Sequence, residues 1–120
     1  MDCPFCNIDA SRFIADSEFA FAVNDIHPVS RGHSLIIPKI HVQNYFNLDK
    51  VYQNECWELV NKVRDFLQDK YNPDGYNVGL NINRIAGQGV LHAHIHVIPR
   101  YSGKTNENFA IENMASKDFF

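Results

Sequence analysis

The sequence predicts a single domain of mixed architecture, in which several short β-strands accompany one long α-helix. Apolar residues recur at spacings of three and four from residue 49 to about residue 71, which is the period of an amphipathic helix. Elsewhere, short stretches of alternating polar and apolar residues lie between Gly, Pro, Asn and Asp, which is typical of strands and turns. A chain of 120 residues can bury one hydrophobic core but not two.

The composition is that of an ordinary soluble domain, with 45% hydrophobic and 21% charged residues. A net charge of −3 gives no basic field for a nucleic-acid polymer, and no apolar run approaches the ~20 residues of a membrane span. The first residues lack the basic and apolar regions of a secretory signal. With an odd count of three cysteines, we therefore expect reduced thiols and a cytoplasmic location.

Three short strands are expected in the first third of the chain. Residues 13–16 and 19–23 are predicted to form a hairpin, and alternation places bulky Phe and Val side chains on one face of its second strand. The third strand covers residues 33–37, where alternation puts His33 on the same face as Leu35.

The helix predicted over residues 49 to about 71 is preceded by an irregular or helical link, residues 39–46, and ended by the turn residues 72–75. Cys56 and Trp57 are interpreted as packing residues, so Cys56 is not expected to be catalytic. The apolar stripe consists of Tyr52, Cys56, Leu59, Val60, Val63, Phe66 and Leu67.

Two further strands are predicted over residues 76–82 and from about residue 90 onwards. The segment Ala86-Gly87-Gln88-Gly89 lies between them. Its glycines allow backbone N–H groups to approach an anion closely, although a simple hairpin turn explains them equally well.

The most informative stretch is a row of three histidines, His92, His94 and His96, which alternate with Ala, Ile and Val and precede Pro99. On a strand, the period of two would place the three imidazoles on one face. A buried imidazole costs desolvation free energy and needs a partner, so three in register indicate an active or ligand-binding face.

Metal binding and nucleophilic catalysis are the two chemistries that such a row suggests. All three rings can converge on one ion only with strain, because alternate strand residues lie ~6.7 Å apart. A neutral imidazole can instead attack phosphorus and form a covalent phosphoramidate. The central histidine would attack, its neighbours would orient and donate, and Gln88 and Gly87 would add donors.

Cys3 and Cys6 are spaced as one half of a zinc site, for which His41 and His92 are candidate partners. Two cysteines alone are weak evidence for a zinc site. The alternative is that this spacing of Cys3 and Cys6 arose by chance and that they bind no metal.

Together these motifs resemble the signature of the histidine-triad (HIT) nucleotide hydrolases and transferases. The row His92-x-His94-x-His96 follows Ala86-Gly87-Gln88, as in that family. The likeness extends from residue 3 to about residue 101, and its other motifs are Asn24-Asp25-Ile26-x-Pro28, Gly32-His33-x-Leu35-x-Ile37-Pro38-Lys39-x-His41, Gly79-x-Asn81 and Ile98-Pro99-Arg100-Tyr101.

The resemblance implies an α+β fold, with an antiparallel sheet of about five strands, one long helix and a short helical link, assembled as a homodimer. It implies one HIT domain over residues 1–120, with residues 102–120 as a C-terminal tail. It further implies cleavage at the α-phosphorus of a purine nucleotide, usually an adenosine phosphoramidate or dinucleoside polyphosphate, through a nucleotidyl-histidine intermediate. No metal would be required for this chemistry.

The resemblance also assigns roles by position. His94 would be the nucleophile, His96 would bind phosphate and assist the leaving group, and His92 and His33 would support and orient the site. Asp25 would hold the ribose hydroxyls. The other nucleotide contacts would be Phe5, Ile8, Val23 and Ile26 around the base, and Asn81, Gln88, Gly89 and Val90 at the phosphate or leaving group.

Many bacterial members of the family carry a structural zinc held by a CxxC pair and two histidines, and Cys3, Cys6, His41 and His92 match those positions. The resemblance therefore implies a closed tetrahedral zinc site. It also gives His92 a structural role in place of a chemical one.

Two positions depart from the family pattern. Gly89 stands where a Ser or Thr hydroxyl usually contacts phosphate, and Asn83 stands where Gly is common. Neither change removes a catalytic histidine. Two alternatives remain open, namely a non-catalytic nucleotide-binding module and a metal-dependent hydrolase that uses two of the histidines.

Overall fold

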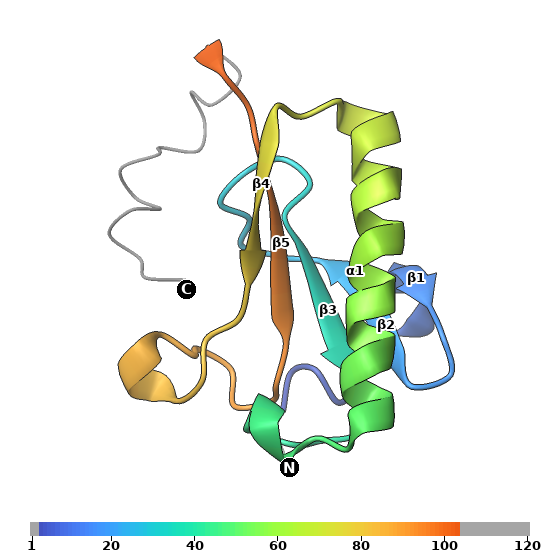
Figure 1. Cartoon of the computed structure of the whole chain (residues 1–120), viewed down its shortest axis with the longest axis vertical. Coiled ribbons are helices and arrows are strands. Elements are labelled where there is room, and N and C mark those ends of the chain that lie inside the picture. Colours follow the sequence, from blue (N-terminus) through green and yellow to red (C-terminus); the bar gives the residue numbers. More distant parts are fainter. Residues whose placement is uncertain (1–2, 104–120) are drawn as a thin grey trace.

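The computed structural model describes residues 3–103, which form a five-stranded antiparallel sheet with one long helix (Figure 1). The predicted α+β fold is confirmed. In chain order the elements are η1 (Ala10–Arg12), β1 (Phe13–Asp16), β2 (Ala20–Asn24), β3 (Ser34–Pro38), η2 (Tyr45–Asn47), α1 (Lys50–Tyr71), β4 (Gly75–Gly79), η3 (Arg84–Ala86) and β5 (Ile95–Arg100).

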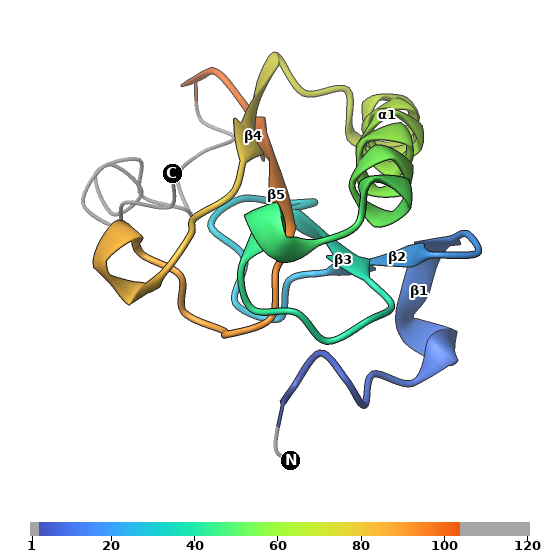
Figure 2. The same cartoon turned by 60° about the horizontal axis from the view of Figure 1, so that its bottom comes forward.

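The strands are ordered β1-β2-β3-β5-β4, so the last strand in the chain lies inside the sheet. The helix α1 covers one face, and the segment before η1 lies below the other (Figure 2). The N-terminal segment reaches the residues just before β5, where the ring of Phe5 lies 5.0 Å from that of His94. In residues 3–103, no helix is long and apolar enough to cross a membrane.

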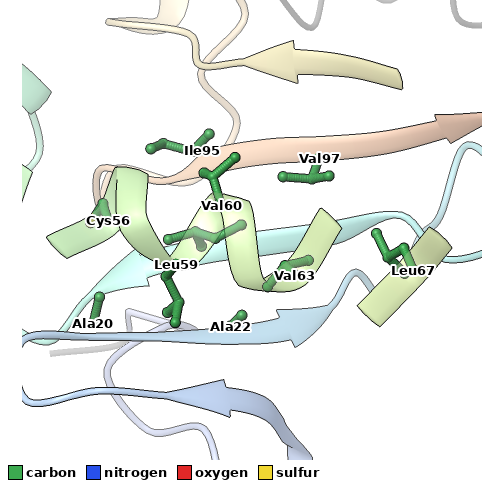
Figure 3. Close-up of a cluster of buried hydrophobic side chains, with 10 residues drawn as sticks. Ala20, Ala22, Cys56, Leu59, Val60, Val63, Leu67, Ile95 and Val97 are labelled. Carbon is green, nitrogen blue, oxygen red and sulfur yellow. The ribbon is translucent and has the colours of Figure 1, made fainter. Parts of the chain in front are cut away.

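The helix packs through most of its predicted stripe onto small and branched residues of β2, β3 and β5 (Figure 3). Ala20 and Ala22 carry little bulk, so they allow the helix to approach the sheet. Cys56 is buried here, and burial raises the pKa of its thiol to about 12, which confirms its packing role. Phe66 and Trp57 were expected to pack but are 40% and 37% exposed and lie outside this cluster.

The opposite face of the sheet carries most of the bulky residues that alternation predicts: Phe21, Val23, Leu35 and Ile37. Phe19 was expected on the same face but precedes β2, and its ring lies 5.1 Å from that of Tyr52 on α1. Phe5, Ile8 and Phe13 pack against them from the N-terminal segment and the start of β1. No helix of the described chain covers this face, which leaves room for a cavity.

Two predicted strands differ from the structure. β4 ends at Gly79 and not at residue 82, and Val78 is exposed because β4 is an edge strand. β5 begins at Ile95, so His92 and His94 precede the strand that was expected to carry the whole histidine row. The hydrogen-bond ladder between β3 and β5 begins at the Ile36–Ile95 pair. It does not extend further along β3, because Pro38 has no N–H to donate. The tail predicted from residue 102 lies almost entirely outside the described residues.

Candidate active site

A cavity of about 590 Å³ lies on the face opposite α1, between the N-terminal segment and strands β2, β3 and β5. Most of the predicted nucleotide and catalytic residues line it: Phe5, Ile8, Val23, Asp25, Ile26, His33, Asn81, Gly89, Val90, His94 and His96. Asn24, which belongs to a predicted motif but was given no role, also lines it, and so does Arg12, which the sequence did not single out.

A backbone carbonyl sets the tautomer of His94. The Nδ1 atom of His94 lies 2.7 Å from the carbonyl oxygen of His92. Because a carbonyl only accepts hydrogen bonds, Nδ1 carries the proton. The Nε2 atom therefore holds the ring's lone pair, which is the form that a nucleophilic imidazole needs.

A second chain of hydrogen bonds orients His96. The backbone N–H of Val29 donates to Nδ1 of His33 at 3.1 Å, so His33 carries its proton on Nε2. That nitrogen lies 3.0 Å from Nδ1 of His96 and donates to it. His96 in turn keeps its proton on Nε2, which makes it a potential proton donor within the cavity.

Burial keeps these imidazoles neutral at pH 7. It lowers the pKa of His33 to about 4 and that of His96 to about 3, and the neighbouring His94 lowers both further. Burial also lowers the pKa of His94. The rings of His94 and His96 lie 5.0 Å apart, so a neutral nucleophile stands beside a neutral proton donor.

Asp25 follows β2, and its carboxylate contacts two groups of the protein. One carboxylate oxygen accepts a hydrogen bond from the backbone N–H of His27 at 2.9 Å, which is an Asx turn. The other lies 3.5 Å from Nε2 of His33. The carboxylate is half-buried and lines the cavity, so it can also accept from hydroxyl groups of a ligand.

Gln88 does not line the cavity. Its buried side chain accepts from the backbone N–H of Asn83 at 2.7 Å and donates to the carbonyls of Gln43 and Val90. The side chain thus holds together the loop that carries Gly89. Asn83, the second departure from the family pattern, has φ 74° and ψ 156°, a conformation that favours Gly.

Cys3, Cys6, His41 and His92 form a separate corner next to this cavity, as predicted from the motif, with their candidate ligand atoms all within 4.8 Å of one another. Nδ1 of His92 lies 3.4 Å from Sγ of Cys3, 3.7 Å from Sγ of Cys6 and 3.2 Å from Nδ1 of His41. Zn–S bonds of about 2.3 Å and Zn–N bonds of about 2.0–2.1 Å in a tetrahedron separate ligand atoms by about 3.3–3.8 Å.

The protonation of His92 also suits a metal. Its Nε2 donates to the carbonyl oxygen of Pro38 at 3.0 Å, which leaves the lone pair on Nδ1, facing the cysteines. The donor set and the spacing therefore fit zinc.

Asp25, His33 and His96 form a second cluster with ligand atoms within 4.8 Å. This cluster fits a metal poorly. A metal on Nε2 of neutral His33 would move the proton to Nδ1, directly against the N–H of Val29. The tautomers thus favour metal binding at Cys3, Cys6, His41 and His92, and proton transfer at Asp25, His33 and His96.

The groups that orient these rings carry no signal in the sequence. The carbonyls of His92 and Pro38 and the N–H of Val29 are backbone atoms, and any residue other than proline supplies the same N–H donor. For Arg12 the sequence offered only a weak indication of a place near the sheet, because this residue directly precedes the strand residue Phe13. Its approach to the cavity depends on how β1 pairs with β2.

A fold with this sheet, this cavity and this set of oriented imidazoles defines a histidine-triad protein. The family model of the HIT domain matches residues 7–103, and the chain belongs to the HIT family. It is 36% identical over 104 residues to the protein named hit of Bacillus subtilis, covering 83% of this chain and 72% of that protein.

Two other relatives have names that state a reaction. An adenosine 5'-monophosphoramidase of Schizosaccharomyces pombe is 36% identical over 115 residues, covering 92% of this chain and 80% of the relative. A bis(5'-adenosyl)-triphosphatase of Dictyostelium discoideum is 31% identical over 111 residues, covering 92% and 74%.

Solved structures agree with the fold. A HIT family protein of Bacillus anthracis has a TM-score of 0.80 and 31% identity, covering 96% of this chain and 91% of that one. A Zn-bound histidine triad protein of Mycobacterium smegmatis has a TM-score of 0.77 and 28% identity, covering 86% and 78%.

Proposed function

We propose that this protein hydrolyses purine nucleotides at the α-phosphorus, acting on a nucleoside phosphoramidate or a dinucleoside polyphosphate. The observation that carries the proposal is the tautomer of His94, whose protonated Nδ1 leaves the Nε2 lone pair for attack. The reactions named for two relatives, a phosphoramidase and a dinucleoside triphosphatase, both break a bond at a nucleotide phosphorus and support the same class.

In the first step, Nε2 of His94 attacks the α-phosphorus and forms a phosphorus–nitrogen bond. The bond from phosphorus to the leaving group breaks, and the Nε2 proton of His96 passes to a leaving amine or hydrogen-bonds to a leaving phosphate. When the proton is transferred, the negative charge left on His96 is offset by the positive charge that His94 gains on bonding to phosphorus. In the second step, water attacks the same phosphorus and passes a proton back to His96. The bond to His94 then breaks and releases the nucleoside monophosphate.

The other cavity residues would bind the substrate in this reaction. Asp25 would accept from the ribose hydroxyls, and Phe5, Ile8, Val23 and Ile26 would enclose the base. Backbone N–H groups near Gly89 and the amide of Asn81 would bind the phosphate. Zinc at Cys3, Cys6, His41 and His92 would hold the N-terminal segment in place and take no part in the chemistry.

Release of AMP from adenosine 5'-phosphoramidate tests the proposal. The His94→Ala variant is expected to lose at least about 10³-fold in kcat while retaining AMP binding. An alkaline quench of the wild-type reaction should preserve an adenylyl adduct, located on His94 by mass spectrometry of peptides. Unchanged AMP release by the variant would refute the mechanism, and AMP binding without any turnover would favour the non-catalytic alternative.

We also infer a homodimer and a cytoplasmic location. Trp57, Phe66 and Val78 are apolar and at least one-third exposed, and β4 is an edge strand of the described sheet. A partner covering these residues would bury apolar surface and pair the backbone N–H and C=O groups of the edge strand. A thiolate zinc site suits a reducing compartment. Light scattering of the full chain, with Val78→Lys as the disruptive variant, tests the dimer.

A further inference from the structure

The cavity runs across the strands of the sheet. Cross-strand pairs connect His96 to Leu35, Leu35 to Val23 and Val23 to Phe13, so these four residues form one transverse row over β5, β3, β2 and β1. Three strand spacings make this row about 14 Å long. A nucleoside monophosphate with its phosphate at His94 and His96 would lie along the row.

Arg12 lies at the far end of this row. It directly precedes Phe13 and closes η1, which lies at the β1 edge of the sheet, on the opposite side of the molecule from η3 (Figure 2). Arg12 lines the same cavity as His94 and His96. The catalytic rings and the guanidinium are therefore at opposite ends, and the carboxylate of Asp25 lies at the catalytic end, beside His33 and His96.

The charge of Arg12 is available to a ligand. Among residues 3–103, its guanidinium makes no hydrogen bond or ion pair. The carboxylate of Asp25, which also lines the cavity, is already engaged with the N–H of His27 and with His33. Arg12 is the one permanently cationic side chain of the cavity lining within the described residues.

We propose that Arg12 binds the edge of the nucleotide base and gives the site a preference for 6-oxopurines, guanine and hypoxanthine, over adenine. The inference rests on the proposed function, because it places the phosphate at His94 and so the base toward Arg12. It adds a specificity-determining residue that acts at the end of the cavity remote from the chemistry.

The preference follows from the donors of arginine. A guanidinium carries five N–H donors and no acceptor, so it can pair only with acceptor groups. Guanine and hypoxanthine present two adjacent acceptors, O6 and N7, which a guanidinium binds in a bidentate manner. Adenine presents an amino group at position 6, whose N–H groups face the N–H groups of arginine. One of the two hydrogen bonds is then lost.

The test compares kcat/KM for guanosine, inosine and adenosine 5'-phosphoramidates. The wild-type protein should favour guanosine and inosine over adenosine by about tenfold or more, the selectivity of one bidentate contact. Inosine lacks the 2-amino group of guanosine, so equal treatment of the two would assign the contact to O6 and N7. In the Arg12→Gln variant the preference should fall about tenfold, mainly through KM.

The Arg64→Gln variant is the matched control, because it removes one positive charge from the surface of α1 on the other face of the sheet. It should leave the preference unchanged. Affinities for GMP and AMP, measured by calorimetry, provide a readout independent of turnover.

The two proposals fail differently. If no nucleoside phosphoramidate is hydrolysed, the proposed function is wrong. If all three are hydrolysed and the Arg12→Gln variant keeps the wild-type ratio, the function stands and the inference about Arg12 is overturned. An equal loss for all three substrates would instead place Arg12 at a phosphate, which also overturns it.

Discussion

Nδ1 of His94 donates a hydrogen bond to the backbone carbonyl of His92 at 2.7 Å. The ring of His92 points the other way, toward Cys3, Cys6 and His41, and is anchored by the carbonyl of Pro38. One residue therefore belongs to two sites: its carbonyl orients the proposed nucleophile, and its ring completes the candidate zinc corner.

Zinc removal is expected to weaken nucleotide binding more than it slows the reaction. The segment with Cys3 and Cys6 also carries Phe5, whose ring lies 5.0 Å from that of His94 and lines the cavity. Without metal, this wall loses its anchor. We expect the affinity for AMP to fall about tenfold, corresponding to about 1.4 kcal/mol, with kcat at saturation little changed.

Calorimetry with AMP before and after chelation checks this expectation, and thermal unfolding should show a lower Tm for the metal-free protein. The Cys6→Ser variant should behave as the chelated wild type does. If chelation abolished kcat while the affinity for AMP was retained, the metal-dependent hydrolase would be the better explanation.

Substitution of His96 should have an effect that depends on the leaving group. His33 donates to Nδ1 of His96 and so keeps the proton of His96 on Nε2. A poor leaving group such as an amine needs this proton, so His96→Gln should lower kcat for adenosine 5'-phosphoramidate by about 10²–10⁴-fold.

For an adenosine 5'-phosphate ester of a nitrophenol, the leaving group needs no proton. The His96→Gln variant should therefore lose much less kcat with this substrate. Rates for both substrates, followed by chromatography of released AMP, provide the comparison. Equal losses for the two substrates would contradict a proton-donor role and assign His96 to binding alone.

Stability should decrease as the pH falls below the ordinary histidine range. The pKa of His33 is about 4 and that of His96 about 3 in the folded protein, whereas an unfolded histidine titrates near 6.5. Below pH 6.5 the unfolded chain binds more protons than the folded one. The free energy of unfolding is thus highest above pH 6.5 and falls toward pH 4, by up to about 1.4 kcal/mol per pH unit for each histidine.

Urea titrations between pH 7.5 and 4.5 measure this slope. His33→Gln removes one of these histidines, so the free energy of unfolding of the variant should change less steeply with pH, by the equivalent of about one bound proton. Loss of zinc at acid pH affects both proteins and cancels in the comparison. Identical slopes would show that His33 does not contribute.

Asn83→Gly should stabilise the protein. Asn83 adopts φ 74° and ψ 156°, a region that costs a residue with a side chain about 1–3 kcal/mol. Glycine relieves this strain but loses more chain entropy on folding, so a net gain of about 1 kcal/mol is expected from denaturant unfolding.

Asn72→Gly is the matched control, because Asn72 has φ 51° and ψ 55°, a left-handed conformation that Asn tolerates. The free energy of unfolding should change less in this variant than in Asn83→Gly. A destabilised Asn83→Gly variant would show that the side chain contributes more than the strain costs.

Much of the fold could be predicted because periodicity is a local property. The spacing of apolar residues indicated the helix to within a residue of its observed start, and alternation correctly placed His33 with Leu35 and opposed Ala20 to Phe21. The same reasoning failed at the start of β5, because the end of a strand depends on which partner is available across the sheet.

The sequence by itself determined the long helix, the presence of five strands and the residue types from which the site is made, but not where β4 ends or β5 begins. The tertiary structure decided which nitrogen of each imidazole carries the proton, because the groups that decide it are the backbone atoms of Val29, Pro38 and His92. It also brought Arg12 to the end of the cavity, 84 positions before His96 in the chain, through three successive strand pairings. Hydrogen-bond direction and cross-strand neighbours are properties of the folded chain, and no local pattern of residues encodes them.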